Sequence, residues 1–251
     1  MNTTLIAAIL FVCLAGVVFV GRRVRRYLPQ DHLSADSKDA VKLAMGLVAT
    51  MSALVLGLLV SSAKDSYDTK RSEVIQMAAK VAFLERVLAL YGPEATEARG
   101  DLRGAVSDAV QRLWPTERNR PVQLGPNEQV ADAFYIALQR LSPKDDTQRA
   151  LKTQAETLSV ELGQLRSLLV AQSIPSISKP MLIILVSWLA IIFLGFSVLA
   201  PPNATTALAL MVSALAVSGA VFLILELDQP FGGLIRITNA PMLNVLNRLS
   251  K

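Results

Sequence analysis

The chain has 251 residues, 52% of them hydrophobic, and a formal net charge of +5. So large an apolar share is high for a soluble protein and indicates a membrane protein. The chain has one cysteine, Cys13, and one histidine, His32, which excludes an internal disulfide and metal centres built from several cysteines or histidines. We therefore expect no metal and no cofactor. We also expect no enzyme, because neither a phosphate-binding glycine loop nor a nucleophile with a recognisable base is visible.

The first predicted element is a membrane span over residues 4–20, followed by the basic sequence RRVRR at 22–26. A cleaved signal peptide carries its positive charges before the apolar stretch, so the reverse order found here predicts a span that stays in the protein. Two interpretations fit the basic cluster. It determines the topology of the span, or it binds anionic lipid headgroups.

The second predicted element is a helix whose apolar part covers residues 41–60, about the 20 residues that cross a bilayer. No helix breaker follows, so we expect this helix to leave the membrane and continue into water. Small residues recur along it at every fourth position and form a groove where another backbone can approach. Two interpretations fit this groove. Another span of the same subunit packs into it, or the same helix of other copies of the chain packs into it around an axis. The pore-lining or packing candidates are Ala49, Ala53, Leu54, Gly57, Leu58 and Ser61, and the vestibule candidates are Lys64, Asp65 and Asp68.

Residues 63–173 form a richly charged segment that contains as many Lys and Arg residues as Asp and Glu residues. Its neutral balance removes the electrostatic support for nucleic-acid binding. Apolar residues recur at spacings of three and four and form stripes, which predicts four helices in an antiparallel bundle, and no stretch alternates with the period of a strand. The two long stripes are Val74, Met77, Val81, Leu84, Leu88 and Tyr91, and Leu151, Ala155, Leu158, Leu162, Leu165 and Leu169. The predicted breaks between these helices are Gly92-Pro93, Pro115, the loop at 116–126, and Ser142-Pro143. The last of these, with Asp145 close by, suits an N-cap followed by proline at the first helical position.

Two further spans are predicted over residues 181–200 and 204–225. Glu226 and Asp228 follow directly and form an acidic motif at the membrane boundary. Carboxylates at such a depth are costly unless they are hydrated or paired. Several interpretations fit this motif. The two carboxylates could bind a cation, attract or exclude permeant ions, or pair with Arg236. Alternatively, they simply lie at an exposed helix end.

The predicted fold is an all-α integral membrane protein with four transmembrane helices and a helical-bundle domain between spans 2 and 3. After the last span, residues 234–249 form an amphipathic tail suited to the membrane interface. The predicted domains are transmembrane helices 1 and 2 at 1–62, the bundle at 63–175, transmembrane helices 3 and 4 at 176–226, and the tail at 227–251.

Three stretches carry a family resemblance: GLLVSSAKDSYDTKRSEVIQMAAK at 57–80, LYGPEATEARGDLR at 90–103, and APPNATTALALMVSALAVSGAVFLILELDQPFGGLIRI at 200–237. They resemble the bacterial bestrophin-like domain family, four-span membrane proteins that are distantly similar to bestrophin anion channels. The resemblance implies a homo-oligomer, a pentamer if it follows the bestrophins, in which residues 45–61 line the pore.

Two functions are consistent with these patterns. The first is an oligomeric ion channel, anion-conducting by resemblance, whose second span lines the pore. The alternative is a non-conducting membrane scaffold or sensor whose helical bundle recruits a partner. The expected partners are the lipid bilayer, copies of the chain and small inorganic ions, and not nucleic acid. The five Lys and Arg residues of the 22–38 loop favour a bundle outside the cell, whereas the Lys and Arg residues near the span ends on the opposite side favour a bundle inside. The family resemblance also favours the inside, so we expect a multi-pass protein of the bacterial inner membrane with a cytoplasmic bundle.

Overall fold

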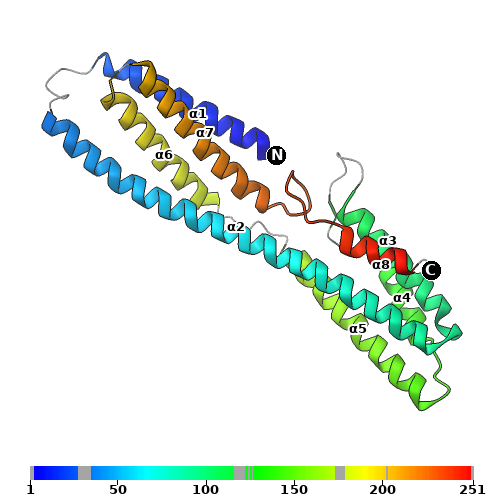
Figure 1. Cartoon of the computed structure of the whole chain (residues 1–251). Coiled ribbons are helices and arrows are strands. Elements are labelled where there is room, and N and C mark those ends of the chain that lie inside the picture. Colours follow the sequence, from blue (N-terminus) through cyan, green and yellow to red (C-terminus); the bar gives the residue numbers. More distant parts are fainter. Residues whose placement is uncertain are drawn as a thin grey trace. The chain divides into compact units, whose positions relative to one another are not determined.

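The protein is built of helices, as a computed structural model of the chain shows (Figure 1). The structure describes residues 3–27, 35–115, 122–123, 125, 127–172, 179–201 and 203–249, and it has no strand among them. Most of the predicted loop at 116–126 lies outside the described residues. The elements are α1 (Thr3–Arg25), α2 (Ala35–Tyr91), η2 (Pro93–Ala95), α3 (Thr96–Leu113), α4 (Glu128–Gln139), α5 (Asp146–Ala171), α6 (Lys179–Leu199), α7 (Ala204–Leu227) and α8 (Ala240–Leu249). They fall into two compact units.

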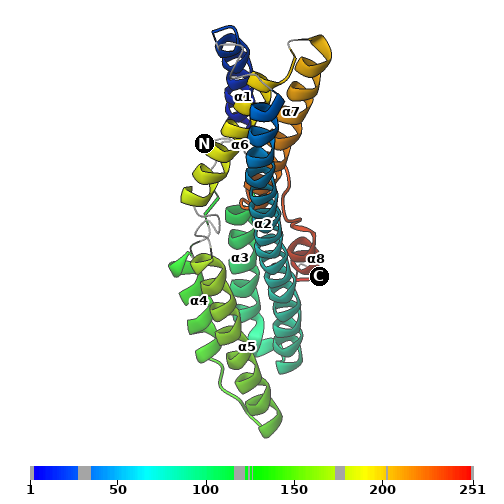
Figure 2. The ribbon, with the colours of Figure 1, turned by 90° about the vertical axis from the view of Figure 1, so that its left-hand side faces the viewer.

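Residues 1–67 and 175–229 form the first unit, called here the membrane unit. It contains α1, α6, α7 and the N-terminal part of α2, and α1 packs against both α6 and α7 (Figures 1 and 2). Each of the four helices is long and apolar enough to cross a membrane, with mean hydropathy between 2.3 and 2.8 over its best stretch. The prediction of an all-α membrane protein with four spans is therefore confirmed.

Two glycines of the membrane unit mark places where helices approach closely. A Cβ atom on Gly21 of α1 would lie 2.7 Å from the Cβ of Ser197 on α6. Ser197 uses this proximity, because its hydroxyl donates to the carbonyl of Val18 at 2.5 Å. Two residues before Ser197 on α6, the side chain of Met45 from α2 occupies the space that a Cβ on Gly195 would need. Small residues thus hold α1 and α2 on α6, as is usual where membrane helices pack.

Two arginines of the basic cluster bind backbone carbonyls around the end of α6. Arg25 donates from Nη1 to the carbonyls of Val198, at 3.2 Å, and Ala200. Arg22 donates from Nη2 to the carbonyl of Asn203 at 3.0 Å. The last carbonyls of a helix lack intrahelical partners and carry partial negative charge, so cations stabilise them. The cluster therefore fastens α1 to the turn between α6 and α7, a role that neither interpretation of its sequence included.

Residues 68–174 and 230–251 form the second unit, called here the helical unit. It contains the C-terminal part of α2 together with α3, α4, α5 and α8. Helix α2 runs unbroken for 57 residues, which confirms that the second span continues as one helix beyond its apolar part.

The helix ends in this unit follow from local chemistry. Helix α2 stops before Gly92, whose φ of 116° is open to glycine and strained for other residues, and Pro93 then starts η2. Helix α5 begins after Asp145, whose carboxylate accepts the backbone N–H of Gln148 at 2.7 Å. The N-cap is therefore Asp145 and not Ser142, because only the carboxylate of Asp145 lies three residues before that free N–H.

The predicted apolar stripes build the core of the helical unit. Every member of the α2 stripe is buried: Val74, Met77, Val81, Leu84, Leu88 and Tyr91. On α5 the burial is uneven, because Leu158 and Leu169 are buried whereas Leu162 is half-buried. Leu162 lines a cavity among the helices of this unit, which accounts for its remaining exposure.

The C-terminal segment is fastened to the helical unit through Trp114. The indole Nε1 of Trp114 donates to the carbonyl of Ile237 at 2.7 Å, and the ring meets Phe231 edge-on with centroids 5.8 Å apart. The N–H of Ile237 also closes the turn by donating to the carbonyl of Pro230 at 2.8 Å. Helix α8 then packs on α3 and buries Met242. Its apolar face is used inside this unit, which removes our reason for laying the tail along a membrane interface. The exact domain boundaries stay a prediction.

Candidate pore-lining surface on α2

Within the membrane unit, α2 has one face packed on its own subunit and one face turned away from it. The packed face is a line of buried residues seven or four positions apart: Met45, Ser52, Leu59 and Ala63. The hydroxyl of Ser52 donates to the carbonyl of Val48 at 2.8 Å, so this buried polar group is satisfied within the helix. On the opposite face, Leu54 and Leu58 are 71% and 60% exposed. This outward face is the candidate pore-lining surface.

The four small residues of the predicted groove do not share one environment. Ala49 and Ala53 border an apolar hollow of about 280 Å³ that is also lined by residues of α6 and α7. Gly57 and Ser61 are exposed, and no atom lies within 4 Å of the position that a Cβ on Gly57 would take. Close packing between spans of one subunit therefore does not account for the glycine at position 57.

The outward face continues directly into charged residues. Residues seven apart lie almost in line on a helix, with a drift of about 20°. Each vestibule candidate stands seven positions after a pore-lining candidate: Lys64 after Gly57, Asp65 after Leu58, and Asp68 after Ser61. All three charged residues are exposed. One face of α2 thus changes from small and apolar to charged within two helical turns.

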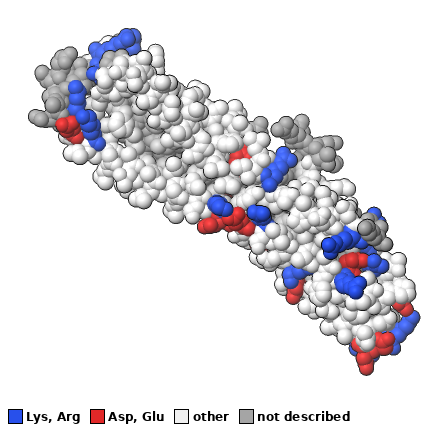
Figure 3. Space-filling view, viewed as in Figure 1, with Lys and Arg blue, Asp and Glu red and all other residues white. Residues whose placement is uncertain are grey.

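The surface charge follows the same division. Figure 3 shows uncharged surface along the apolar part of α2, with Lys, Arg, Asp and Glu side chains before and after it. At the start of this helix, Lys42 pairs with Asp39 at 2.9 Å. The uncharged stretch between these charges matches the apolar span at 41–60.

The acidic motif at the end of α7 has a structural role that its sequence did not suggest. Glu226 is 1% exposed, so its interpretation as an exposed helix end is wrong. Its Oε1 accepts a hydrogen bond from the hydroxyl of Thr3, which joins the start of α1 to the end of α7. Asp228 is half-buried and forms the C-cap of α7. Arg236, a predicted partner, donates from Nε to the carbonyl of Gly233 at 2.7 Å. Any action of the motif on ions remains a prediction.

Sequence reasoning missed the residues that hold α2 on its subunit, because the span is apolar on every side. The seven-residue spacing of Met45, Ser52 and Leu59 was the available signal, since it places them on one line of the helix. Among the residues that the structure describes, no group of three or more His, Cys, Asp or Glu side chains is arranged to hold a metal ion.

The Bestrophin-like domain matches residues 12–242 of the chain. The chain belongs to the bestrophin-like family. This confirms the resemblance seen in the three sequence stretches. Three crystal structures of single-residue variants of a bacterial bestrophin homolog from Klebsiella pneumoniae share the fold, with TM-scores of 0.71, 0.74 and 0.71. Each is 14% identical to the chain, and each comparison covers 97% of both chains. No curated protein sequence matched the chain.

Proposed function

We propose that this protein is a homo-oligomeric channel of the bacterial inner membrane, conducting small inorganic anions along the outward face of α2. The supporting observation is the composition of that face. Exposed apolar side chains on other spans, such as Leu208 on α7 at 66% exposure, suit contact with lipid. Exposed small residues also occur on α7, at Ser213 and Gly219. The outward face of α2 differs because it runs directly into the exposed charged residues Lys64, Asp65 and Asp68. Copies arranged around an axis bring such faces together at a common channel.

In this proposal the apolar part of α2 forms a narrow constriction that conducts when it is wetted. Leu54 and Leu58 are the large side chains on that face, and they set its width. Lys64 is the first charged residue after the uncharged stretch, so an ion leaving the constriction meets it before Asp65 and Asp68. A cation there raises the local concentration of anions. The anion preference rests on the family relationship, since the mouth carries charges of both signs.

Ion flux into liposomes tests the proposal. Purified protein, with assembly confirmed after reconstitution, is expected to conduct chloride, and Leu54→Ala is expected to increase the flux because a wider apolar constriction wets more easily. Leu208→Ala is the matched control, being the same truncation at an exposed position on α7. The ratio of anion to cation permeability is expected to fall from wild type to Lys64→Gln, and to fall further in Lys64→Glu. Assembled wild-type protein that conducts nothing contradicts the channel.

A scaffold or sensor is the second candidate, and exposed apolar side chains on the helical unit favour it. Phe83 and Leu90 on α2 are 49% and 57% exposed, and Ile136 on α4 is 48% exposed. Such side chains suit a protein partner. This candidate predicts no flux from wild type and none from the Leu54→Ala variant, so the liposome assay separates the two functions.

The proposed orientation places the helical unit in the cytoplasm. Helices α1 and α7 run antiparallel, because Thr3 bonds Glu226 at one end and Arg22 bonds Asn203 at the other. With four spans, the start of α1, the helical unit and the end of α7 belong to one side of the membrane. The family relationship and the Lys and Arg residues near the span ends on that side favour the cytoplasm for it, against the five Lys and Arg residues of the 22–38 loop.

A further inference from the structure

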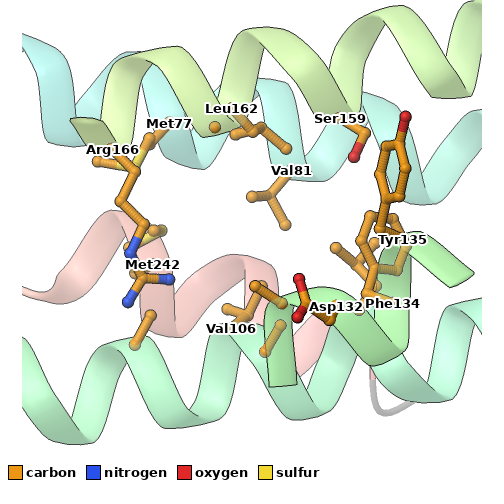
Figure 4. Close-up of a pocket in the computed structure, with 15 residues that line it drawn as sticks. Met77, Val81, Val106, Asp132, Phe134, Tyr135, Ser159, Leu162, Arg166 and Met242 are labelled. Carbon is orange, nitrogen blue, oxygen red and sulfur yellow. The ribbon is translucent and has the colours of Figure 1, made fainter. Parts of the chain in front are cut away.

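The helical unit contains a cavity of about 290 Å³ that is partly open to solvent and is lined by residues of α2, α3, α4, α5 and α8. Its volume lies close to the lower end of the about 300–1,000 Å³ found for small-molecule sites. The lining is mostly apolar, and the close-up in Figure 4 shows these side chains arranged around a common space. The apolar lining includes Met77, Val81, Val106, Phe134, Leu162 and Met242.

Two charged side chains also line the cavity, and their surroundings differ. Arg166 comes from α5 and Asp132 from α4, and they lie on different sides of the space (Figure 4). Asp132 is exposed, so water solvates its carboxylate. Arg166 is partly buried, and its desolvation lowers the pKa of the guanidinium. The group still carries its charge at neutral pH, because arginine does not lose its proton in proteins.

The positive charge of Arg166 is only partly balanced by the protein. The carboxylate of Asp108 stabilises it, whereas the guanidinium of Arg112 opposes it. Asp108 is already engaged, since its Oδ2 lies 3.0 Å from Nε of Arg112. One carboxylate therefore serves two guanidinium groups. Arg166 donates a long hydrogen bond from Nη2 to the carbonyl of Gly125 at 3.4 Å, and this neutral acceptor brings no negative charge.

We propose that this cavity binds a small amphiphilic carboxylate, with its apolar body among Met77, Val81 and Phe134 and its carboxylate on Arg166. The apolar lining favours a hydrophobic body. The partly desolvated guanidinium favours an anion, and its planar fork matches the two oxygens of a carboxylate. The inference concerns the helical unit alone and does not depend on conduction through α2.

The test compares 4-phenylbutyrate with its neutral analogue 4-phenylbutanol, using the full chain in lipid nanodiscs and equilibrium dialysis, with empty nanodiscs subtracted. Wild type is expected to bind the acid at least about tenfold more tightly than the alcohol, because only the acid pairs with Arg166. Arg166→Gln is expected to bind both compounds equally, and Arg166→Lys to keep part of the preference. Circular dichroism checks that each variant is folded.

A pair of glycine substitutions tests the location of the site. Gly163 lines the cavity, and no atom lies within 4 Å of the position of an added Cβ. Gly163→Leu therefore occupies empty space and is expected to abolish binding of both compounds without unfolding the protein. Gly104→Leu on α3 is the control, since it also meets no atom within 4 Å and lies outside the lining. Equal binding of acid and alcohol by wild type, no binding of the acid, or binding unchanged by Gly163→Leu overturns the proposal.

Discussion

Replacing Gly57 by leucine is expected to leave the stability of a single subunit unchanged or improved and to weaken the assembly of several subunits. Within one chain the new side chain meets nothing, because no atom lies within 4 Å of its Cβ position. Leucine is also a better helix former than glycine by about 0.8 kcal/mol. The subunit is therefore expected to fold at least as well as wild type.

Between subunits the same leucine is expected to be harmful. If Gly57 lies where α2 helices of neighbouring copies meet, overpacking costs about 1–3 kcal/mol per site. Each interface is then weakened by a factor of about 5 to 150, and symmetry repeats the effect in every subunit. Sedimentation velocity in detergent over a range of protein concentrations measures this as a shift of the association midpoint toward higher concentration.

Two further glycines supply the controls for this experiment. Gly219→Leu on α7 places the same side chain at a position that also has no atom within 4 Å, and it is expected to assemble like wild type. Gly21→Leu is expected to damage the subunit itself, because its Cβ would lie 2.7 Å from that of Ser197. A Gly57→Leu protein that assembles as wild type does would refute the reasoning and place the glycine against lipid.

The remaining predictions concern orientation and pH. In a Cys13→Ser background, Ser142→Cys is expected to resist an impermeant thiol reagent in intact cells and to react after lysis, because position 142 is exposed on the helical unit; labelling of intact cells contradicts the orientation. Tyr91 is 2% exposed, and its burial, followed by the charge of Glu94, raises the pKa of the phenol above 10.0. The unfolded state then ionises first as pH rises, so stability is full below about pH 10 and falls above it. Tyr91→Phe is expected to lessen that loss in thermal unfolding followed by circular dichroism from pH 8 to 11, whereas equal alkaline sensitivity of the two proteins contradicts it.

Much of the fold was predictable because its signals are local. The apolar stripe on α2 and the break at Gly92 are patterns of a few residues, and the structure places both as expected. The four spans were visible for the same reason, as long apolar stretches. Local pattern was insufficient at the start of α5, where an N-cap followed by Pro143 was expected but the helix begins after Asp145.

The contacts that sequence reasoning missed join distant parts of the chain. Thr3 and Glu226 are 223 positions apart, and no local pattern links them. In the sequence, Arg25 indicated only topology or lipid binding. Its acceptors are the backbone carbonyls of Val198 at the end of α6 and of Ala200 just after it, and a sequence pattern does not reveal backbone acceptors. The candidate surface on α2 was found only in part. Spacing revealed its small residues, but an evenly apolar span does not tell which face its own subunit covers.

The attachment of the C-terminal segment to α3 constrains the order of events during synthesis. Trp114 and its acceptor Ile237 are separated by 123 positions, and α8 follows later still. At a translation rate of about 5–20 residues per second, roughly 6–25 s pass between the two residues. During that interval α6 and α7 are made, while the surface of α3 that later receives α8 has no cover from its own chain. The helical unit is therefore completed only after all four spans have been synthesised, and a ribosome stalled within α7 leaves it unfinished.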